Sequence, residues 1–263
     1  MLLGQRLVVV LPAYNAGRTL PVVYAELQAN PYVDDMILVD DASTDDTVDV
    51  ARSLGLQPIV HTTNRGYGAN QKTCYETALR RGADIVVMLH PDHQYSGHLV
   101  TAMAAMVASR EYALVLGSRI TAQHNALSGG MPLYKFVANR ALTLVENWSL
   151  HLKMSEYHSG YRAFSRQLLE QLPLGENSDD FVFDNQIIAQ ARWYGFRIGE
   201  ISCPTRYDAD SRSITFRRAV QYGWGVVRTA FEYRAAAWGL GAPSYLGART
   251  VPTATGVSSE QTP

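Results

Sequence analysis

The feature that most constrains the fold is a regular alternation of short apolar runs with longer amphipathic segments over the first 120 residues. Each apolar run is typical of a buried strand, and the apolar residues between runs recur at helical spacing. Strands that alternate with helices form a mainly parallel sheet with helices on both faces. The sequence therefore predicts an α/β fold with a Rossmann-like sheet, whose strands we expect at 6–15, 35–41, 57–63, 84–89 and 112–119.

Polar side chains follow three of these predicted strands. Tyr14 and Asn15 follow the first strand, Asp40 and Asp41 end the second, and the stretch 90–92 (His-Pro-Asp) follows the fourth. Because ligands of open α/β sheets bind outside the carboxyl ends of the strands, we expect these side chains to share one site.

The second half of the chain has a different pattern. Residues 134–150 predict an amphipathic helix, 181–195 a second helix, 196–208 a strand, and 214–240 a long helix rich in aromatic residues and arginine. The segment 243–263 is rich in Pro, Thr, Ser and Gly, so we expect it to be a disordered tail. The first of these helices should carry its apolar residues on one face, namely Tyr134, Val137, Ala141, Leu144, Val145 and Trp148.

The composition of the chain indicates which partners to expect and which cellular compartment suits the protein. The formal net charge of −1 over 263 residues gives no overall positive field, so we expect no nucleic-acid partner. Cys74 and Cys203 lie far apart and form no metal or redox motif, which favours buried thiols in a reduced, cytoplasmic protein. No apolar run approaches the roughly 20 residues of a membrane span. The helix at 214–240 could still lie on the inner face of a membrane as a peripheral contact.

Two of the motifs suit a nucleotide. Tyr14 offers a flat surface for a ring, and an aspartate at the end of the second strand can accept from a base N–H. Alternatively, Asp40 and Asp41 only cap the following helix, for which Ser43 or Thr44 is the expected N-cap. The stretch 64–72 (NRGYGANQK) places two glycines at a helix start, where backbone can approach a phosphate; taken alone, the stretch favours a simple turn over a site.

The stretch 86–95 (VVMLHPDHQY) suits a metal. Asp92 follows a buried strand, where a carboxylate could hold a hard divalent cation against a diphosphate. The alternative is an ordinary loop acid.

Together these motifs resemble glycosyltransferase family 2, and in particular its polyprenyl-phosphate sugar synthase branch, over residues 5–235. The resemblance implies a GT-A fold, a nucleoside-diphosphate-sugar donor linked to UDP or GDP, a Mg or Mn ion, and inversion at the anomeric carbon. It rests on six stretches in family order: VVVLPAYNAGRTL, ILVDDASTDDT, NRGYGANQK, VVMLHPDHQY, LGSR and SGYRAFS.

The resemblance also assigns donor-site residues. The family's base-binding aspartate falls on Asp41, and the metal motif, usually Asp-x-Asp with a glutamine two residues on, matches at Asp92 and Gln94 but has His90 as its first residue. His90 could be a nitrogen ligand better suited to Mn than to Mg, could contact phosphate, or could have no role. The other donor-binding residues expected on this basis are Pro12, Ala13, Tyr14, Asn15, Asp40, Gly68 and Pro91.

Four arginines and one aspartate complete the expected site. Arg119 and Arg162 are expected to bind phosphate, and Arg206 and Arg212 lie on a loop that resembles the one closing over the donor diphosphate. For the arginines, surface or core-bridging roles are the alternative. By family position Asp184 is the candidate general base, followed by Asp180; a helix N-cap with first-turn acids is the alternative there.

The resemblance and the periodicity together predict one GT-A domain over 1–242, with a nucleotide-sugar half at 1–120 and an acceptor half at 121–242. The favoured acceptor is a polyprenyl phosphate, which is already ionised and needs no strong base. A soluble hydroxyl acceptor, a sugar-nucleotide nucleotidyltransferase, a non-catalytic nucleotide-binding relative and a homo-oligomer remain open.

Overall fold

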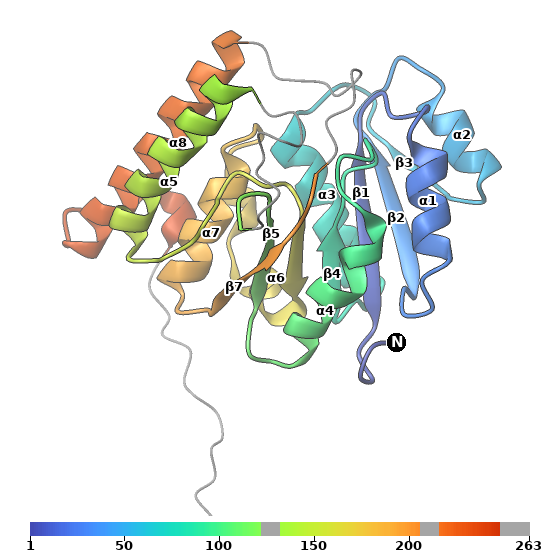
Figure 1. Cartoon of the computed structure of the whole chain (residues 1–263), viewed down its shortest axis with the longest axis horizontal. Coiled ribbons are helices and arrows are strands. Elements are labelled where there is room, and N and C mark those ends of the chain that lie inside the picture. The colour runs from blue at the N-terminus through green and yellow to red at the C-terminus, as the bar shows by residue number, and fades with distance from the viewer. Residues whose placement is uncertain (122–131, 206–215, 248–263) are drawn as a thin grey trace, which may run out of the picture.

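The computed structural model describes residues 1–121, 132–205 and 216–247, and its centre is a seven-stranded sheet (Figure 1). Across the sheet the strands follow the order β3-β2-β1-β4-β6-β5-β7. Their bounds are β1 (Leu7–Ala13), β2 (Asp35–Asp40), β3 (Ile59–Val60), β4 (Ile85–Met88), β5 (Leu114–Ser118), β6 (Arg162–Ser165) and β7 (Ile198–Ser202).

Parallel pairing dominates the sheet, as expected. Among the pairings between described strands, only those of β6 are antiparallel: β6 lies between β4 and β5, with Arg162 opposite Met88 on one side and Leu116 on the other. The sequence did not predict β6, because four residues with two polar side chains lack the apolar run of a buried strand. Strands from both halves of the chain therefore share one sheet.

Helices cover both faces of the sheet. Alternate residues of β1 point to opposite faces: Val9 joins the core that includes Val23 of α1, and Val8 joins the core that includes Tyr75 of α3 and Ile187 of α7. The helices are α1 (Leu20–Gln28), α2 (Thr47–Ser53), α3 (Tyr67–Arg80), α4 (Val100–Ala108), α5 (Leu133–Leu150), α6 (Arg166–Gln171), α7 (Phe183–Trp193) and α8 (Phe216–Ala237). Short 3₁₀ turns lie at Gly97–Leu99, Leu174–Glu176 and Ser244–Leu246.

At β1 the order in which strands join the sheet changes direction. The chain leaves β1 through α1 to β2 and β3 on one side, and later returns to β4 on the other side of β1. The carboxyl ends of β1, β2 and β4 therefore border a crevice at this switch point, where open α/β sheets bind ligands.

Helices α5 and α8 lie side by side at one end of the molecule (Figure 1). The predicted apolar face of α5 faces outward: Tyr134, Leu144 and Trp148 are 62%, 64% and 54% exposed. Its buried positions are mostly polar and include Thr143 and Glu146. Helix α8 adds further exposed apolar side chains. In the described part of the chain, no helix is long and apolar enough to cross a membrane.

The first residues of the expected disordered tail are folded. Ser244–Leu246 form a turn in which Tyr245 and Leu246 are buried, and the Tyr245 carbonyl accepts from Gln190 Nε2 at 2.7 Å. Two large apolar side chains are enough to hold this segment against α7 and α8. The remainder of the predicted tail, 248–263, lies outside the described residues.

Candidate functional site

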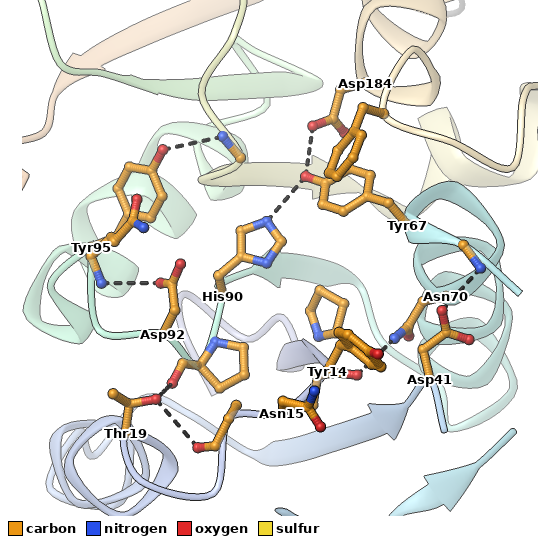
Figure 2. A pocket seen from close by; sticks show the side chains of 18 of the residues that line it. Tyr14, Asn15, Thr19, Asp41, Tyr67, Asn70, His90, Asp92, Tyr95 and Asp184 are labelled. Atoms are coloured by element: carbon orange, nitrogen blue, oxygen red, sulfur yellow. Dashed lines mark hydrogen bonds between the residues drawn. The ribbon is translucent and has the colours of Figure 1, made fainter. Parts of the chain in front are cut away.

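A cleft of about 940 Å³ lies at the carboxyl ends of β1, β2 and β4 (Figure 2). It brings together residues as far apart in the sequence as Pro12 and Tyr222. The expected site residues that line it are Pro12, Ala13, Tyr14, Asn15, Asp41, His90, Pro91, Asp92, Gln94, Arg119, Asp180 and Asp184.

Asp40 does not line the cleft. It is fully buried, its Oδ2 accepts from the Ser43 backbone N–H at 2.9 Å, and its Oδ1 accepts from the Ser43 hydroxyl. Asp40 therefore makes these contacts within the protein. The expected N-cap at Ser43 or Thr44 is wrong, because α2 begins only at Thr47 and its N-cap is Asp46. The intervening loop is held instead by Asp40 and by Asn15 Oδ1, which accepts from the Thr44 N–H at 2.7 Å.

Gly68 is a packing residue. Its N–H donates to the Asp179 carbonyl at 2.8 Å, and a Cβ at this position would lie 2.4 Å from the Ser178 carbonyl oxygen. Gly68 therefore does not line the cleft. The other glycine of the motif, Gly66, lines the cleft instead.

Arg162 is also internal. It is fully buried, and its guanidinium donates to the carbonyls of Ser159 at 2.9 Å, Tyr157 at 3.0 Å and Asp184 at 2.5 Å. These bonds hold the guanidinium inside the protein, and Arg162 does not line the cleft. Arg206 and Arg212 lie outside the described residues.

Asp41 stands at the end of β2 with its carboxylate tightly held. His61 Nδ1 lies 2.7 Å from Oδ1, and the backbone N–H groups of Arg65 and Gly66 donate to Oδ1 and Oδ2 at 2.8 and 2.9 Å. Tyr14, 48% exposed, stands on the same side of the cleft (Figure 2). This side of the cleft therefore pairs an exposed ring with an oriented hydrogen-bond acceptor.

A hydrogen-bonded chain crosses the middle of the cleft (Figure 2). The Tyr67 hydroxyl donates to Asp184 Oδ2 at 2.8 Å and lies 3.0 Å from His90 Nε2. Burial and the Asp184 charge raise the pKa of Tyr67 well above its ordinary value, so the hydroxyl keeps its single proton. Because that proton goes to Asp184, His90 Nε2 must carry hydrogen and donate to the Tyr67 oxygen. In the neutral tautomer with its hydrogen on Nε2, the lone pair of the ring lies on Nδ1.

Gln71 and Gly160 hold the side chains of this hydrogen-bonded chain in place. Gln71 Nε2 donates to Asp184 Oδ1 at 3.1 Å, so both carboxylate oxygens already accept hydrogen bonds. A Cβ on Gly160 would lie 2.6 Å from His90 Nε2 and 3.2 Å from the Tyr67 hydroxyl, which makes glycine necessary for this arrangement.

The described residues fit a divalent cation that a ligand helps to hold. Among them there is no group of three or more His, Cys, Asp or Glu side chains able to enclose a metal alone. Asp92 is exposed in the cleft, its Oδ1 accepts from the Gln94 N–H at 3.0 Å, and His90 with its Nδ1 lone pair stands two residues away. One carboxylate with one nitrogen suits a cation whose remaining ligands are phosphate oxygens.

Arg119 lines the cleft with its charge already balanced. Its Nε donates to Glu156 Oε1 at 2.8 Å and its backbone N–H donates to Oε2 at 2.8 Å, while Nη2 bonds Oε1 and the His158 carbonyl. Burial alone would raise the pKa of Glu156, but the charge and hydrogen bonds of Arg119 hold that pKa below its ordinary value. Glu156 therefore fixes the orientation of Arg119 at the cleft wall.

A ring of four buried or half-buried side chains, joined by hydrogen bonds on three sides, supports the α8 side of the cleft. His158 Nδ1 lies 2.8 Å from the Tyr222 hydroxyl, which donates to Asn185 Oδ1 at 2.8 Å; Asn185 Nδ2 donates to Glu146 Oε1 at 2.6 Å. On the fourth side Glu146 Oε2 and His158 Nε2 approach to 3.4 Å, and neither atom makes a hydrogen bond within the described residues. Burial raises the pKa of Glu146 to about 8 and lowers that of His158 to about 4, so at neutral pH both are uncharged.

Sequence reasoning missed several cleft residues. Tyr67 lies between the two glycines of its motif, which was the only signal for it. His61 directly follows the two-residue strand β3 and acts on the cleft through Asp41. Thr19 Oγ1 donates to the Pro91 carbonyl at 2.6 Å and so joins α1 to the loop after β4. Arg218 and Tyr222 come from α8, where the pattern indicated only a surface helix.

Comparison with known proteins finds a matching family and relatives that transfer sugars. The sequence profile of the family described as "Glycosyl transferase family 2" matches residues 8–172. The UDP-N-acetylglucosamine–dolichyl-phosphate N-acetylglucosaminyltransferase of Methanococcus voltae is 26% identical over 215 residues, which are 75% of this chain and 84% of that protein. The polyprenol monophosphomannose synthase of Mycolicibacterium smegmatis is 27% identical over 210 residues, covering 75% of this chain and 76% of that protein.

A solved structure shares the fold. Glucosyl-3-phosphoglycerate synthase from Mycobacterium tuberculosis, in complex with uridine diphosphate, superimposes with a TM-score of 0.67 at 19% sequence identity, covering 88% of this chain and 81% of that one. The expected GT-A fold is thereby confirmed.

Proposed function

Because the chain belongs to glycosyl transferase family 2, in its dolichol-phosphate sugar synthase-like branch, we propose that it moves a sugar from a nucleoside-diphosphate-sugar to a polyprenyl phosphate, with inversion at the anomeric carbon. The names of the relatives support a lipid-phosphate acceptor. The glycosyltransferase class follows from the family, and the donor, the acceptor and the stereochemistry are the proposal.

The donor would lie across the carboxyl ends of the strands. The base would meet Asp41 and pack near Tyr14, and the diphosphate would reach the loop after β4, where Asp92, His90 Nδ1 and Gln94 stand. These three residues would hold a Mg or Mn ion together with the diphosphate, and that ion would neutralise the charge of the leaving group. His90 favours Mn, because an imidazole nitrogen suits it better than Mg.

The chain of Tyr67 and Asp184 would keep His90 in its working tautomer. Carboxylates that act through an intervening hydrogen bond commonly orient metal-binding histidines. Since both oxygens of Asp184 already accept hydrogen bonds and Arg162 Nη1 lies 3.6 Å from Oδ1, we assign Asp184 a positioning role in place of general base. An ionised phosphate acceptor needs no such base, which agrees with this role.

The observation that carries the acceptor proposal is the inverted helix α5. Its apolar side chains face outward and its polar ones are buried, and α8 beside it exposes Trp224 (72%) and Phe231 (56%). Helix α8 also contributes Arg218 and Tyr222 to the cleft, so the apolar face adjoins the site. A surface of this kind, with Trp residues and arginines together, suits the interface of a bilayer that contains the acceptor.

The test is transfer from radiolabelled UDP- and GDP-linked sugars, with Mn²⁺, to a short-chain polyprenyl phosphate in phospholipid vesicles. We expect label in the organic phase, and none with Asp92→Ala. Trp224→Ser should lower vesicle-dependent transfer, whereas Tyr32→Ser, a matched loss of an exposed aromatic (44% exposed) outside α5 and α8, should not. If every donor leaves the lipid unlabelled but is turned over with soluble acceptors, the lipid acceptor is wrong.

A further inference from the structure

We propose that the donor is uridine-linked in preference to guanosine-linked, and that His61 sets this preference by occupying, on Oδ1 of Asp41, the acceptor direction that a second base donor would need. The inference rests on the proposed function, which places the nucleobase against Asp41. It deepens that function by choosing between the two nucleotides.

The carboxylate of Asp41 has one acceptor site left. It is 3% exposed, and an ionised carboxylate only accepts, with about four lone-pair directions over its two oxygens. Oδ1 takes hydrogen bonds from His61 Nδ1 and the Arg65 N–H, and Oδ2 takes one from the Gly66 N–H. Within the described residues, these three donors leave a single free direction, on Oδ2.

His61 is a fixed donor. The residue is 8% exposed, and its backbone N–H donates to the Asp40 carbonyl at 2.9 Å, which joins β3 to β2. Its second ring nitrogen, Nε2, lies 3.1 Å from Thr73 Oγ1 on α3. Because a carboxylate cannot donate, Nδ1 carries the hydrogen. The ring is therefore held between β2 and α3 and cannot turn away to release Oδ1 to a ligand.

The two bases differ in what they require from a carboxylate. Uracil presents one donor, N3–H, between two carbonyl oxygens, and the free direction on Oδ2 satisfies it. Guanine presents two adjacent donors, N1–H and the 2-amino group, which pair with both oxygens of a carboxylate at once. With Oδ1 filled, one guanine donor stays unpaired, and an unpaired buried donor weakens binding by roughly 5- to 150-fold.

The wild-type chain tests the preference directly. Calorimetric titration of the full chain with UDP and with GDP, each with Mn²⁺, should give at least about tenfold tighter binding of UDP. Equal affinities, or tighter binding of GDP, would overturn the inference.

Two substitutions at His61 test its role. His61→Leu frees one acceptor direction on Oδ1, beside the Arg65 N–H, and should bring the affinities for UDP and GDP to within about threefold, mainly by improving GDP. His61→Asn places an amide N–H near the position of Nδ1 and should keep the wild-type ratio. If the leucine variant keeps the wild-type ratio, or weakens both nucleotides equally with a native circular dichroism spectrum, His61 does not set specificity.

A separate variant distinguishes this inference from the proposed function. Asp41→Ala should weaken both nucleotides. If it leaves both affinities unchanged, the base lies elsewhere and the proposed donor site fails. If Asp41 matters but the wild type shows no preference for UDP, only the present inference fails.

Discussion

Replacing Glu146 with glutamine tests the buried ring that supports the α8 side of the cleft. In the wild type, a protonated Glu146 can donate from Oε2 toward His158 Nε2 while Oε1 accepts from Asn185. Glutamine retains both roles, since its amide N–H replaces the carboxyl O–H. The substitution therefore removes the titration and keeps the ring.

The magnitude follows from the raised pKa of Glu146. Its folded value of about 8 lies above the ordinary 4.5, so between these pH values the folded state holds a proton that the unfolded state has lost. The free energy of unfolding of the wild type then falls as pH rises through this window, by about 1.4 kcal/mol per pH unit. From pH 5 to pH 8 the Glu146→Gln variant should gain on the order of 4 kcal/mol relative to the wild type.

The contribution of His158 to stability changes with pH in the opposite direction. Its folded pKa of about 4 lies below the ordinary 6.5, so its contribution to stability is present above pH 6.5 and is lost as pH falls toward 4. Both proteins contain His158, so the difference between them isolates Glu146. At pH 5 the variant should be less stable by about 1 kcal/mol, because the second amide hydrogen has no partner in the ring.

Urea unfolding followed by tryptophan fluorescence at pH 5, 6.5 and 8 measures the difference. Glu76→Gln is the matched control, because its carboxylate is an exposed partner of Arg80 and should change stability by less than about 1 kcal/mol at each pH. The stability difference between Glu146→Gln and the wild type could instead stay constant from pH 5 to pH 8. That result would show that Glu146 is ionised in the folded protein, and it would refute the protonated Glu146 of the ring.

Three further predictions concern the cleft. Asp92→Ala should abolish sugar transfer and leave the melting temperature within about 2 °C, because the side chain is exposed; near-normal turnover at saturating Mn²⁺ would remove it from the metal site. Tyr67→Phe deletes the link between Asp184 and His90 and should weaken Mn²⁺ binding in the presence of UDP by about 10- to 100-fold, measured by electron paramagnetic resonance; an unchanged affinity would mean that His90 does not bind the metal. Gly160→Ala should lower that affinity as well, since its Cβ would displace His90, whereas Gly175→Ala, with open space around it, should not.

The sequence by itself determined the fold class and the family. Both depend on local patterns: the apolar runs of β1, β2 and β4 mark buried strands, and polar residues directly after them must lie at one edge of a parallel sheet. The placement of Asp41 and Asp92 in the cleft follows from this geometry alone. Their roles in binding remain predictions.

Only the tertiary structure decided which polar side chains are available to a ligand. Arg162 and Asp40 belong to motifs that match the family, yet both side chains are buried and make their hydrogen bonds within the protein. Arg162 is buried because β6 lies inside the sheet, and Asp40 because the loop after β2 folds back over it. The orientation of His90 depends on Tyr67 and Asp184, which are 117 residues apart. The outward apolar face of α5 is equally invisible in a periodic pattern, since periodicity shows that a helix has two faces, and only packing decides which face is buried.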